Sequence, residues 1–228
     1  MRTFVFTIMA VDTQAYRKIS AEARTHGARL VAVSKTKPVA DILALYHEGQ
    51  RIFGENYVQE LVGKQPLLPA DIAWHFIGHL QSNKVKYIAA FVSLIHGVDS
   101  KKILTEITKQ GEKLNRVIDC LLQVHIAKEE TKFGLDENEL HELLATNYTN
   151  FTNVRIRGLM GMASFTEDME KVRNEFRFLK SLFDKYTFTI HDSPFTILSM
   201  GMSADYKIAI EEGSNMVRIG SLLFGKRQ

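Results

Sequence analysis

Short apolar runs alternate along this chain with segments in which apolar residues recur every three or four positions. The short runs are typical of buried strands, and the wider spacing is typical of helices with one apolar face. The runs predict eight strands, at residues 30–34, 51–54, 72–77, 94–98, 118–126, 154–160, 195–200 and 216–219.

A helical segment follows each predicted strand. Ser82, Asp99 or Ser100, and Asp136 stand where a side chain can cap the start of the next helix. The predicted helices are residues 39–49, 57–64, a segment from 82, a segment from 99 or 100 to 114, then 136–145, 166–185, 204–212 and 221–224. Residues 12–26 read as one extra helix before the first strand.

Eight strand–helix units predict a single α/β domain with the architecture of a (β/α)8 barrel. Such barrels contain about 250 residues, so one barrel occupies all of residues 1–228. A doubly wound open sheet is the alternative, and the eighth unit makes it the less favourable one.

The composition fits a soluble globular protein. Hydrophobic residues make up 45% and charged residues 24% of the chain, which excludes a disordered chain and a disulfide scaffold. Twenty-nine Lys and Arg face 26 Asp and Glu, and the formal charge of +3 is spread along the chain. We therefore expect no nucleic acid partner.

The cysteine content and the N-terminal segment indicate in which cellular compartment the protein is expected. Cys120 is the sole cysteine of the sequence, so an intrachain disulfide is impossible and a reducing compartment is favoured. The apolar run at residues 4–11 follows one cation, Arg2, and lacks a small-residue cleavage pattern. It is also far too short to span a membrane. We expect a cytoplasmic protein with no membrane partner.

In a (β/α)8 barrel, functional groups lie at the C-terminal ends of the strands. The first predicted strand ends in A-V-S-K-T-K-P, at residues 32–38. Alternation puts Val31, Val33 and Lys35 on one face, and branched side chains favour the barrel interior. Lys35 is thus predicted to point into the mouth, with Lys37 at the rim. A partly desolvated lysine suits Schiff-base chemistry; a solvated surface lysine is the alternative.

The loops after strands seven and eight have the composition of a phosphate site. They read S-M-G-M-S and R-I-G-S, and each opens a predicted helix. Gly201 and Gly220 permit close backbone approach, Ser203 and Ser221 supply hydroxyls, and helix N-termini favour anions. These are the loops in which barrels commonly hold a phosphate. Strand alternation also places Arg218 at the barrel mouth, directed toward a ligand.

Other polar or sulfur-containing residues carry weaker signals. His75 and His79 lie in W-H-F-I-G-H-L-Q-S-N-K, but the further ligands that a zinc site needs are missing from their surroundings. Met160 and Met162 are expected to be packing residues, with a flat ring as one candidate for their contact, and Cys120 is expected in the core. Neither a Walker-type loop nor a G-x-G-x-x-G motif is present, so no motif indicates a nucleotide.

These motifs together resemble the pyridoxal phosphate homeostasis protein family, whose fold is similar to the N-terminal barrel of alanine racemase. The stretches that carry the resemblance are A-V-S-K-T-K-P, F-G-E-N-Y-V-Q-E, W-H-F-I-G-H-L-Q-S-N-K, L-M-G-M, L-S-M-G-M-S-A-D and M-V-R-I-G-S-L-L-F-G. They occur in family order between residues 30 and 225, which is nearly the whole chain. Residues 1–11 do not resemble the family's polar start.

The resemblance implies pyridoxal 5′-phosphate as the cofactor. The family's cofactor lysine is the first one of S-K-T-K, which falls on Lys35, the residue that strand alternation also selects. The resemblance further implies that Ser203, Gly220 and Ser221 hold the phosphate.

The same resemblance implies that Arg218 faces the pyridine nitrogen and that Asn56, His75 and Met162 line the ring pocket. A permanently charged guanidinium beside that nitrogen disfavours its protonation, so the ring is a poorer electron sink. Racemases of this fold work despite that effect, because they have acid–base groups on both faces of the substrate.

Two functions follow from the resemblance. The first is a binding protein of intracellular pyridoxal phosphate homeostasis, which holds the cofactor on Lys35 and delivers it to pyridoxal-phosphate-dependent apo-enzymes. The alternative is a small amino-acid racemase. Alanine racemase takes its opposite-face tyrosine from a second domain, and we expect none here because the sequence ends at Gln228 after the eighth unit. We expect a monomer. A barrel with some other phosphorylated ligand is a third, less favoured reading.

Overall fold

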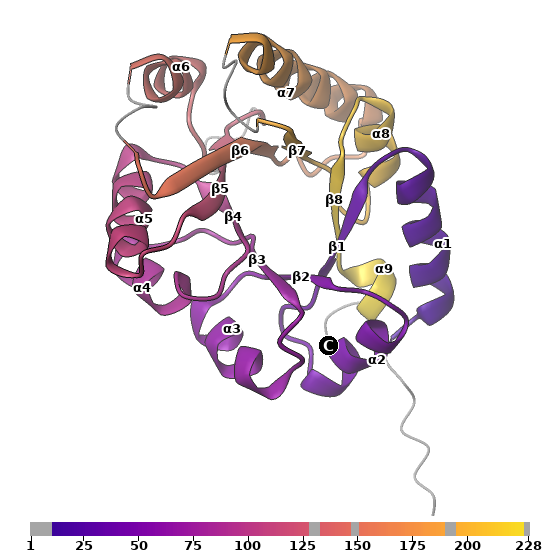
Figure 1. Ribbon diagram of the computed structural model, residues 1–228. Coiled ribbons are helices and arrows are strands. Elements are labelled where there is room, and N and C mark those ends of the chain that lie inside the picture. Colours follow the sequence, from indigo (N-terminus) through magenta and orange to yellow (C-terminus); the bar gives the residue numbers. More distant parts are fainter. Residues whose placement is uncertain (1–10, 128–132, 147–150, 190–194, 226–228) are drawn as a thin grey trace, which may run out of the picture.

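Parallel strands form a closed barrel, in which they follow one another in chain order from β1 to β8 (Figure 1). The computed structural model describes residues 11–127, 133–146, 151–189 and 195–225. β1 (Arg29–Val33) pairs in parallel with β8 (Met216–Ile219), with Val31 opposite Arg218. Because this pairing closes the sheet, the predicted (β/α)8 barrel is confirmed and the open sheet is excluded.

The strands between β1 and β8 agree with the predicted ones to within a few residues. The two largest differences are β5, which ends at Val124, and β7, which is three residues long. The bounds are β2 (Ile52–Glu55), β3 (Ala73–Phe76), β4 (Leu94–Val98), β5 (Ile118–Val124), β6 (Val154–Gly161) and β7 (Ile197–Ser199).

Helices surround the barrel on its outside (Figure 1). Their bounds are α1 (Thr13–Thr25), α2 (Val39–His47), α3 (Val58–Lys64), α4 (Val85–Ile88), α5 (Lys101–Lys113), α6 (Glu137–Thr146), α7 (Met169–Thr189), α8 (Tyr206–Glu211) and α9 (Ser221–Phe224), with 3₁₀ turns η1 (Gln65–Leu67) and η2 (Ser82–Lys84). The extra helix α1 is capped by Asp12, whose carboxylate accepts from the Ala15 N–H at 2.8 Å. The apolar run preceding it lies, up to residue 10, outside the described residues.

Among the predicted capping residues, Asp136 is confirmed, Ser100 occupies the N-cap position of α5 without a side-chain bond, and Ser82 and Thr166 are wrong. Asp136 and Glu139 each accept from the other's backbone N–H, which is a complete capping box before α6. Ser82 caps no helix, because the chain first makes the turn η2 and Gln81 occupies its N-cap position. Thr166 does not open α7. The cap is Asp168, whose carboxylate accepts from the Lys171 N–H at 3.0 Å.

Two sets of apolar side chains fill the molecule. The larger set lies mainly between strands and helices, with Phe53, Phe76 and Phe176 among its fully buried members. A smaller set fills the barrel interior, as layered side chains do in this fold. Its buried members are Val31, Leu94, Leu121, Met160, Ile197 and Met216. The inward position of Val31 confirms the alternation predicted for the first strand.

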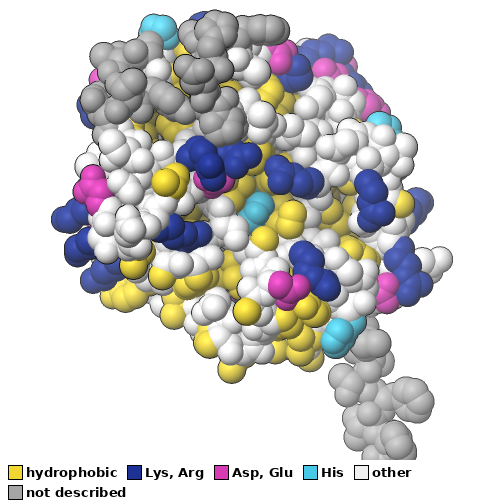
Figure 2. All heavy atoms as spheres, in the orientation of Figure 1, with side chains coloured by type: hydrophobic (Ala, Val, Ile, Leu, Met, Phe, Trp, Pro, Cys, Tyr) yellow, Lys and Arg dark blue, Asp and Glu magenta, His cyan; other side chains and the backbone are white. Residues whose placement is uncertain are grey.

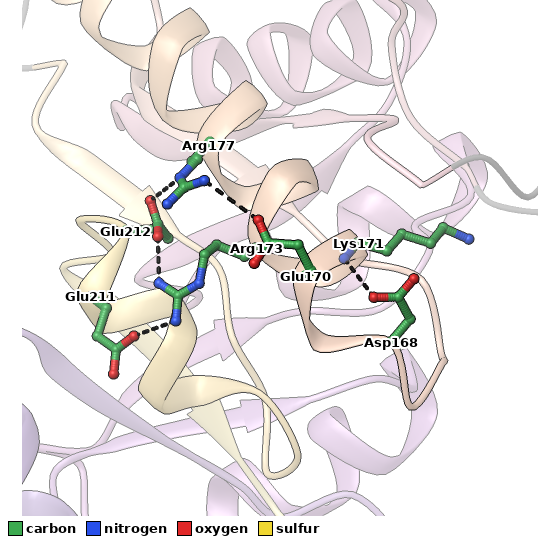
Figure 3. Close-up of polar contacts among 7 residues, drawn as sticks. All are labelled: Asp168, Glu170, Lys171, Arg173, Arg177, Glu211 and Glu212. Atoms are coloured by element: carbon green, nitrogen blue, oxygen red, sulfur yellow. Dashed lines mark hydrogen bonds and ion pairs between the residues drawn. The ribbon is translucent and has the colours of Figure 1, made fainter.

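An ion cluster joins α7 to α8 (Figure 3). Arg173 contacts Glu211 at 2.6 Å and Glu212 at 2.5 Å, and Arg177 contacts Glu212 at 3.1 Å. The two glutamates stand at the C-terminal end of α8. The cluster therefore fixes the helix that follows the loop with Ser203, one of the residues predicted to bind phosphate.

The visible surface carries both signs of charge. On the face shown in Figure 2, Lys and Arg side chains are scattered among acidic and uncharged ones. Within the described ranges, no helix is long and apolar enough to cross a bilayer.

Candidate functional site

A cavity of about 560 Å³ lies where the barrel strands end. It is bounded by the ends of β1, β2 and β3, the segment after β6, and the loops that follow β7 and β8. Its volume falls within the range of small-molecule sites. The predicted site residues that line it are Lys35, Asn56, Met162, Ser203, Arg218, Gly220 and Ser221.

Both lysines of the S-K-T-K segment reach this cavity. Val33, the last residue of β1, and Lys35 line it together, as the alternation along β1 predicts. Lys37 also contributes to the lining, but its Nζ donates to the backbone oxygen of Phe224 at 2.6 Å. Lys37 is thus tied to α9, which agrees with its predicted place at the rim.

The loops after β7 and β8 meet at one wall of the cavity. The Gly220 N–H donates to the Ser203 hydroxyl at 3.3 Å, which joins the two loops directly. Gly201 adopts φ +94°, and a Cβ there would come within 2.5 Å of the Ala209 side chain, so only glycine fits. Ser221 begins α9, and the first N–H groups of a helix have no acceptor within it. This wall thus presents hydroxyls and N–H groups, the donors that a phosphate requires.

Arg218 is a buried cation in the cavity lining. Its side chain donates to the backbone oxygen and hydroxyl of Ser199 at 2.9 and 2.6 Å, and to the backbone oxygen of Gly161 at 3.0 Å. These three acceptors are neutral. Burial lowers the pKa of Arg218 to about 10, against the opposing effect of the Asp205 carboxylate. A buried guanidinium bonded to neutral oxygens favours an anionic or electron-rich ligand group nearby.

A chain of hydrogen bonds continues from Arg218 into the barrel. The Ser199 hydroxyl lies 3.1 Å from Nδ1 of His96, and Nε2 of His96 lies 3.0 Å from Nδ1 of His75. β4 and β7 are not neighbouring strands, so the bond between His96 and Ser199 crosses the barrel interior. Burial lowers the pKa of His75 to about 3 and that of His96 well below its ordinary value. His75 therefore lies in this interior chain and outside the cavity lining, and its predicted contact with the ring stays a prediction.

Asn56 follows β2 directly, and its side chain has an unfilled bonding position. Its Oδ1 atom is buried and has no hydrogen-bond partner among the described residues. Buried polar atoms are nearly always bonded, and Asn56 lines the cavity. A ligand in the cavity can supply the missing partner.

The segment after β6 forms an apolar side of the cavity that the sequence reasoning missed, apart from Met162. Phe165, Met169 and Met202, the last from the loop after β7, line it and are 93%, 40% and 37% exposed. Ser164 fixes this segment, since its N–H and hydroxyl both donate to the buried Glu175 at 2.6 Å. A Ser followed eleven positions later by a Glu on a helix has no recognisable spacing, so this pair could not be found from sequence.

The comparisons with known proteins agree with this geometry. The profile of the family "Alanine racemase, N-terminal domain" matches residues 13–228. Over 203 residues the chain is 44% identical to the pyridoxal phosphate homeostasis protein of Aquifex aeolicus, covering 88% of each protein. The chain belongs to the pyridoxal phosphate homeostasis protein family.

Solved structures extend the likeness to three dimensions. PipY of Synechococcus elongatus, solved without pyridoxal phosphate, is 34% identical, with a TM-score of 0.86 over 92% of this chain and 99% of that chain. The same protein has been solved with pyridoxal phosphate bound, at a TM-score of 0.83. Alanine racemase of Bartonella henselae, 19% identical at a TM-score of 0.72, shares the fold over 95% of this chain and 61% of its own.

Proposed function

We propose that this protein binds pyridoxal 5′-phosphate with Lys35 as its Schiff-base lysine and serves the homeostasis of that cofactor. The observation that carries the proposal is the convergence of Lys35, Arg218 and the Ser203–Ser221 wall on one cavity. These residues lie at or after the ends of β1, β7 and β8, and they meet because the barrel closes. The curated relatives are named homeostasis proteins rather than enzymes, which supports binding without turnover.

The donor set fits the chemistry of this cofactor. Ser203, Ser221 and the first N–H groups of α9 suit the phosphate, and the orphaned Oδ1 of Asn56 marks a position for a polar group of the ring. Arg218 would face the pyridine nitrogen and disfavour its protonation. Met162 supplies an apolar, polarizable surface for the flat ring.

Lys35 would act as an amine nucleophile toward the aldehyde that the bound cofactor supplies. The amine reacts in its neutral form. Arg218 contributes a positive charge to the lining of the same cavity. The role of the chain's own residues is thus to hold the phosphate, orient the ring and present the amine of Lys35 to the cavity.

Delivery of the cofactor to apo-enzymes and a cytoplasmic location are parts of the proposal. The apolar rim at Phe165, Met169 and Met202 leaves the cavity accessible from outside. Cys120 is buried and free, as suits a reducing compartment. To separate direct transfer from release of the cofactor into solution, the loaded protein and an apo-enzyme are placed on opposite sides of a membrane that proteins cannot cross. Transfer only on mixing supports direct delivery, and equal transfer across the membrane contradicts it.

The deciding experiment is the visible spectrum of the purified protein with pyridoxal phosphate, before and after borohydride. In wild type we expect a yellow band, and we expect borohydride to attach the ligand permanently to the protein. In Lys35→Ala we expect neither the band nor the attachment. Lys37→Ala is the matched control, because Lys37 lines the same cavity, and it should retain the band. A colourless wild type contradicts the proposed cofactor, and trapping in Lys35→Ala contradicts the assignment of the lysine.

A racemase is distinguished by α-deuterium exchange over the common amino acids. The proposal predicts no exchange above that of free pyridoxal phosphate. Robust exchange in wild type that Lys35→Ala abolishes would establish an enzyme instead.

A further inference from the structure

A buried cluster of charged side chains lies beside the loop that carries Lys35. Lys64, at the end of α3, donates from Nζ to Ser34 O at 2.8 Å, Glu55 Oε1 at 2.8 Å and Glu60 Oε1 at 2.6 Å. The Glu55 side chain is fully buried, and those of Lys64 and Glu60 are 10% and 22% exposed. All three donor positions of the ammonium group are therefore used.

The two carboxylates of this cluster hold the residues on either side of Lys35. The Ser34 hydroxyl donates to Glu55 Oε1 at 2.6 Å, and the Thr36 N–H donates to Glu60 Oε1 at 2.6 Å. Ser34 is thus held at its side chain and at its backbone oxygen. The backbone that presents Lys35 is fixed at both ends by charged groups.

Thr36 adopts a strained backbone conformation. Its φ is +64°, one of the two positive values among described residues other than glycine. A β-branched residue is a genuine outlier there, and such strain persists only where surrounding contacts impose it. The hydrogen bond to Glu60 is such a contact. The turn after Ser34 is thus bent at an energetic cost, directly next to the proposed Schiff-base lysine.

Stability does not explain this arrangement. Charges removed from water cost more than an apolar core of the same volume, so a buried ion cluster is weak evidence for a stabilising role. Glu55 Oε2 has no hydrogen-bond partner in the described part of the chain, and burial raises the pKa of Glu55 despite Lys64 and Ser34. Because this cluster is energetically costly and lies beside a strained turn, we attribute it to the positioning of the site residues rather than to stability.

We propose that Glu55, Glu60 and Lys64 are positioning residues that hold the Ser34–Thr36 turn so that Lys35 reaches the aldehyde. The inference rests on the proposed function, because it concerns the geometry of the lysine assigned there. None of the three residues is among those that line the cavity. They act through the backbone on the amine of Lys35 and leave the phosphate wall untouched.

The test compares two ligands that differ only at the reacting carbon. Pyridoxal 5′-phosphate carries the aldehyde, whereas pyridoxine 5′-phosphate carries an alcohol and cannot condense with an amine. In Glu60→Ala we expect the Kd for the aldehyde to rise about 10- to 100-fold, the scale of one lost hydrogen bond to a charged group. The Kd for the alcohol should change less than about twofold, since its binding does not use Lys35. Glu60→Gln, which keeps an acceptor oxygen, should lie between wild type and Glu60→Ala.

A second substitution tests the link to Thr36. Glycine adopts φ +64° without strain, so Thr36→Gly in the Glu60→Ala background should recover part of the lost aldehyde affinity. Asp119→Asn is the matched control, because it weakens another ion cluster, with Arg155 and Arg157 at 2.7 and 2.8 Å at the start of β5. It should lower stability and leave both affinities unchanged.

The outcomes separate the inference from the proposed function. Equal losses for both ligands in Glu60→Ala, or no loss for either, overturn the positioning role. If Glu60→Ala does not fold, the same comparison with Glu60→Gln decides. Failure of the proposed function is seen in a different experiment, the borohydride treatment of wild type, in which no ligand would become attached to Lys35.

Discussion

Acidification from pH 7 to pH 5 should destabilise the ligand-free protein through two histidines in the barrel interior. His75 and His96 are buried and bonded to one another, and His96 continues to Ser199. Burial lowers the pKa of both rings. Each is therefore neutral in the folded protein at pH 5, whereas in the unfolded chain each takes up a proton below its ordinary pKa.

The sign and size of this change in stability follow from the linkage between proton binding and folding. The folded pKa of His75 is about 3, against an ordinary value of 6.5, so the unfolded state binds more protons between these values and stability falls as pH falls. From pH 7 to pH 5 this amounts to about 2 kcal/mol for His75. His96 is shifted in the same direction and adds a loss of the same sign. Two such losses are a large share of a typical stability of about 5–15 kcal/mol.

Other titratable groups determine which pH range is measured and which variant is compared with wild type. Glu48, Asp71 and Glu212 have lowered pKa values, so their contributions are lost mainly below pH 5. Glu55 acts in the opposite direction, because burial raises its pKa. The prediction is therefore a difference between wild type and a variant without the two rings.

Urea unfolding at pH 7, 6 and 5 provides the measurement. The double variant His75→Gln and His96→Gln should lose less stability between pH 7 and pH 5 than wild type, by at least about 2 kcal/mol. His47→Gln, which replaces an exposed histidine on α2, serves as the control and should keep the wild-type slope. Equal slopes in wild type and the double variant would refute the reasoning.

Three further predictions concern the walls of the cavity. Glu175→Ala leaves the N–H and hydroxyl of Ser164 without their acceptor, so the free energy of unfolding should fall by about 3 kcal/mol and Tm by roughly 6–12 °C in a thermal melt; an unchanged Tm contradicts this. Gly201→Ala puts a Cβ within 2.5 Å of the Ala209 side chain at φ +94°, and should cost about 2 kcal/mol or more in urea unfolding and weaken phosphate binding in calorimetry. Arg218→Lys keeps a positive charge but loses the planar fork that bonds to Ser199 of β7 and Gly161 of β6, and should raise the Kd for pyridoxal phosphate about tenfold; unchanged affinity would show that charge alone suffices.

The sequence predicted many of the residues that line the cavity because the barrel rule connects order along the chain to place in space. Alternation along β1 follows from the pleat alone, so Lys35 could be directed into the mouth before any contact was known. The Gly-Ser loops after β7 and β8 could be selected because they follow the strands after which barrels commonly hold a phosphate. The two wrong helix starts, at Ser82 and Thr166, share one cause: several polar residues compete near each start, and local sequence does not decide which of them caps.

The sequence by itself thus determined the eight strand–helix units, the inward face of β1 and the junctions that meet at the mouth. Only the tertiary structure decided where polar side chains from different strands find partners. The chain from Arg218 through Ser199 and His96 to His75 crosses the barrel, and Lys64 reaches back to Ser34 thirty residues away. Short-range patterns report which face of an element is buried, whereas a hydrogen bond depends on distances that are set only when the barrel closes.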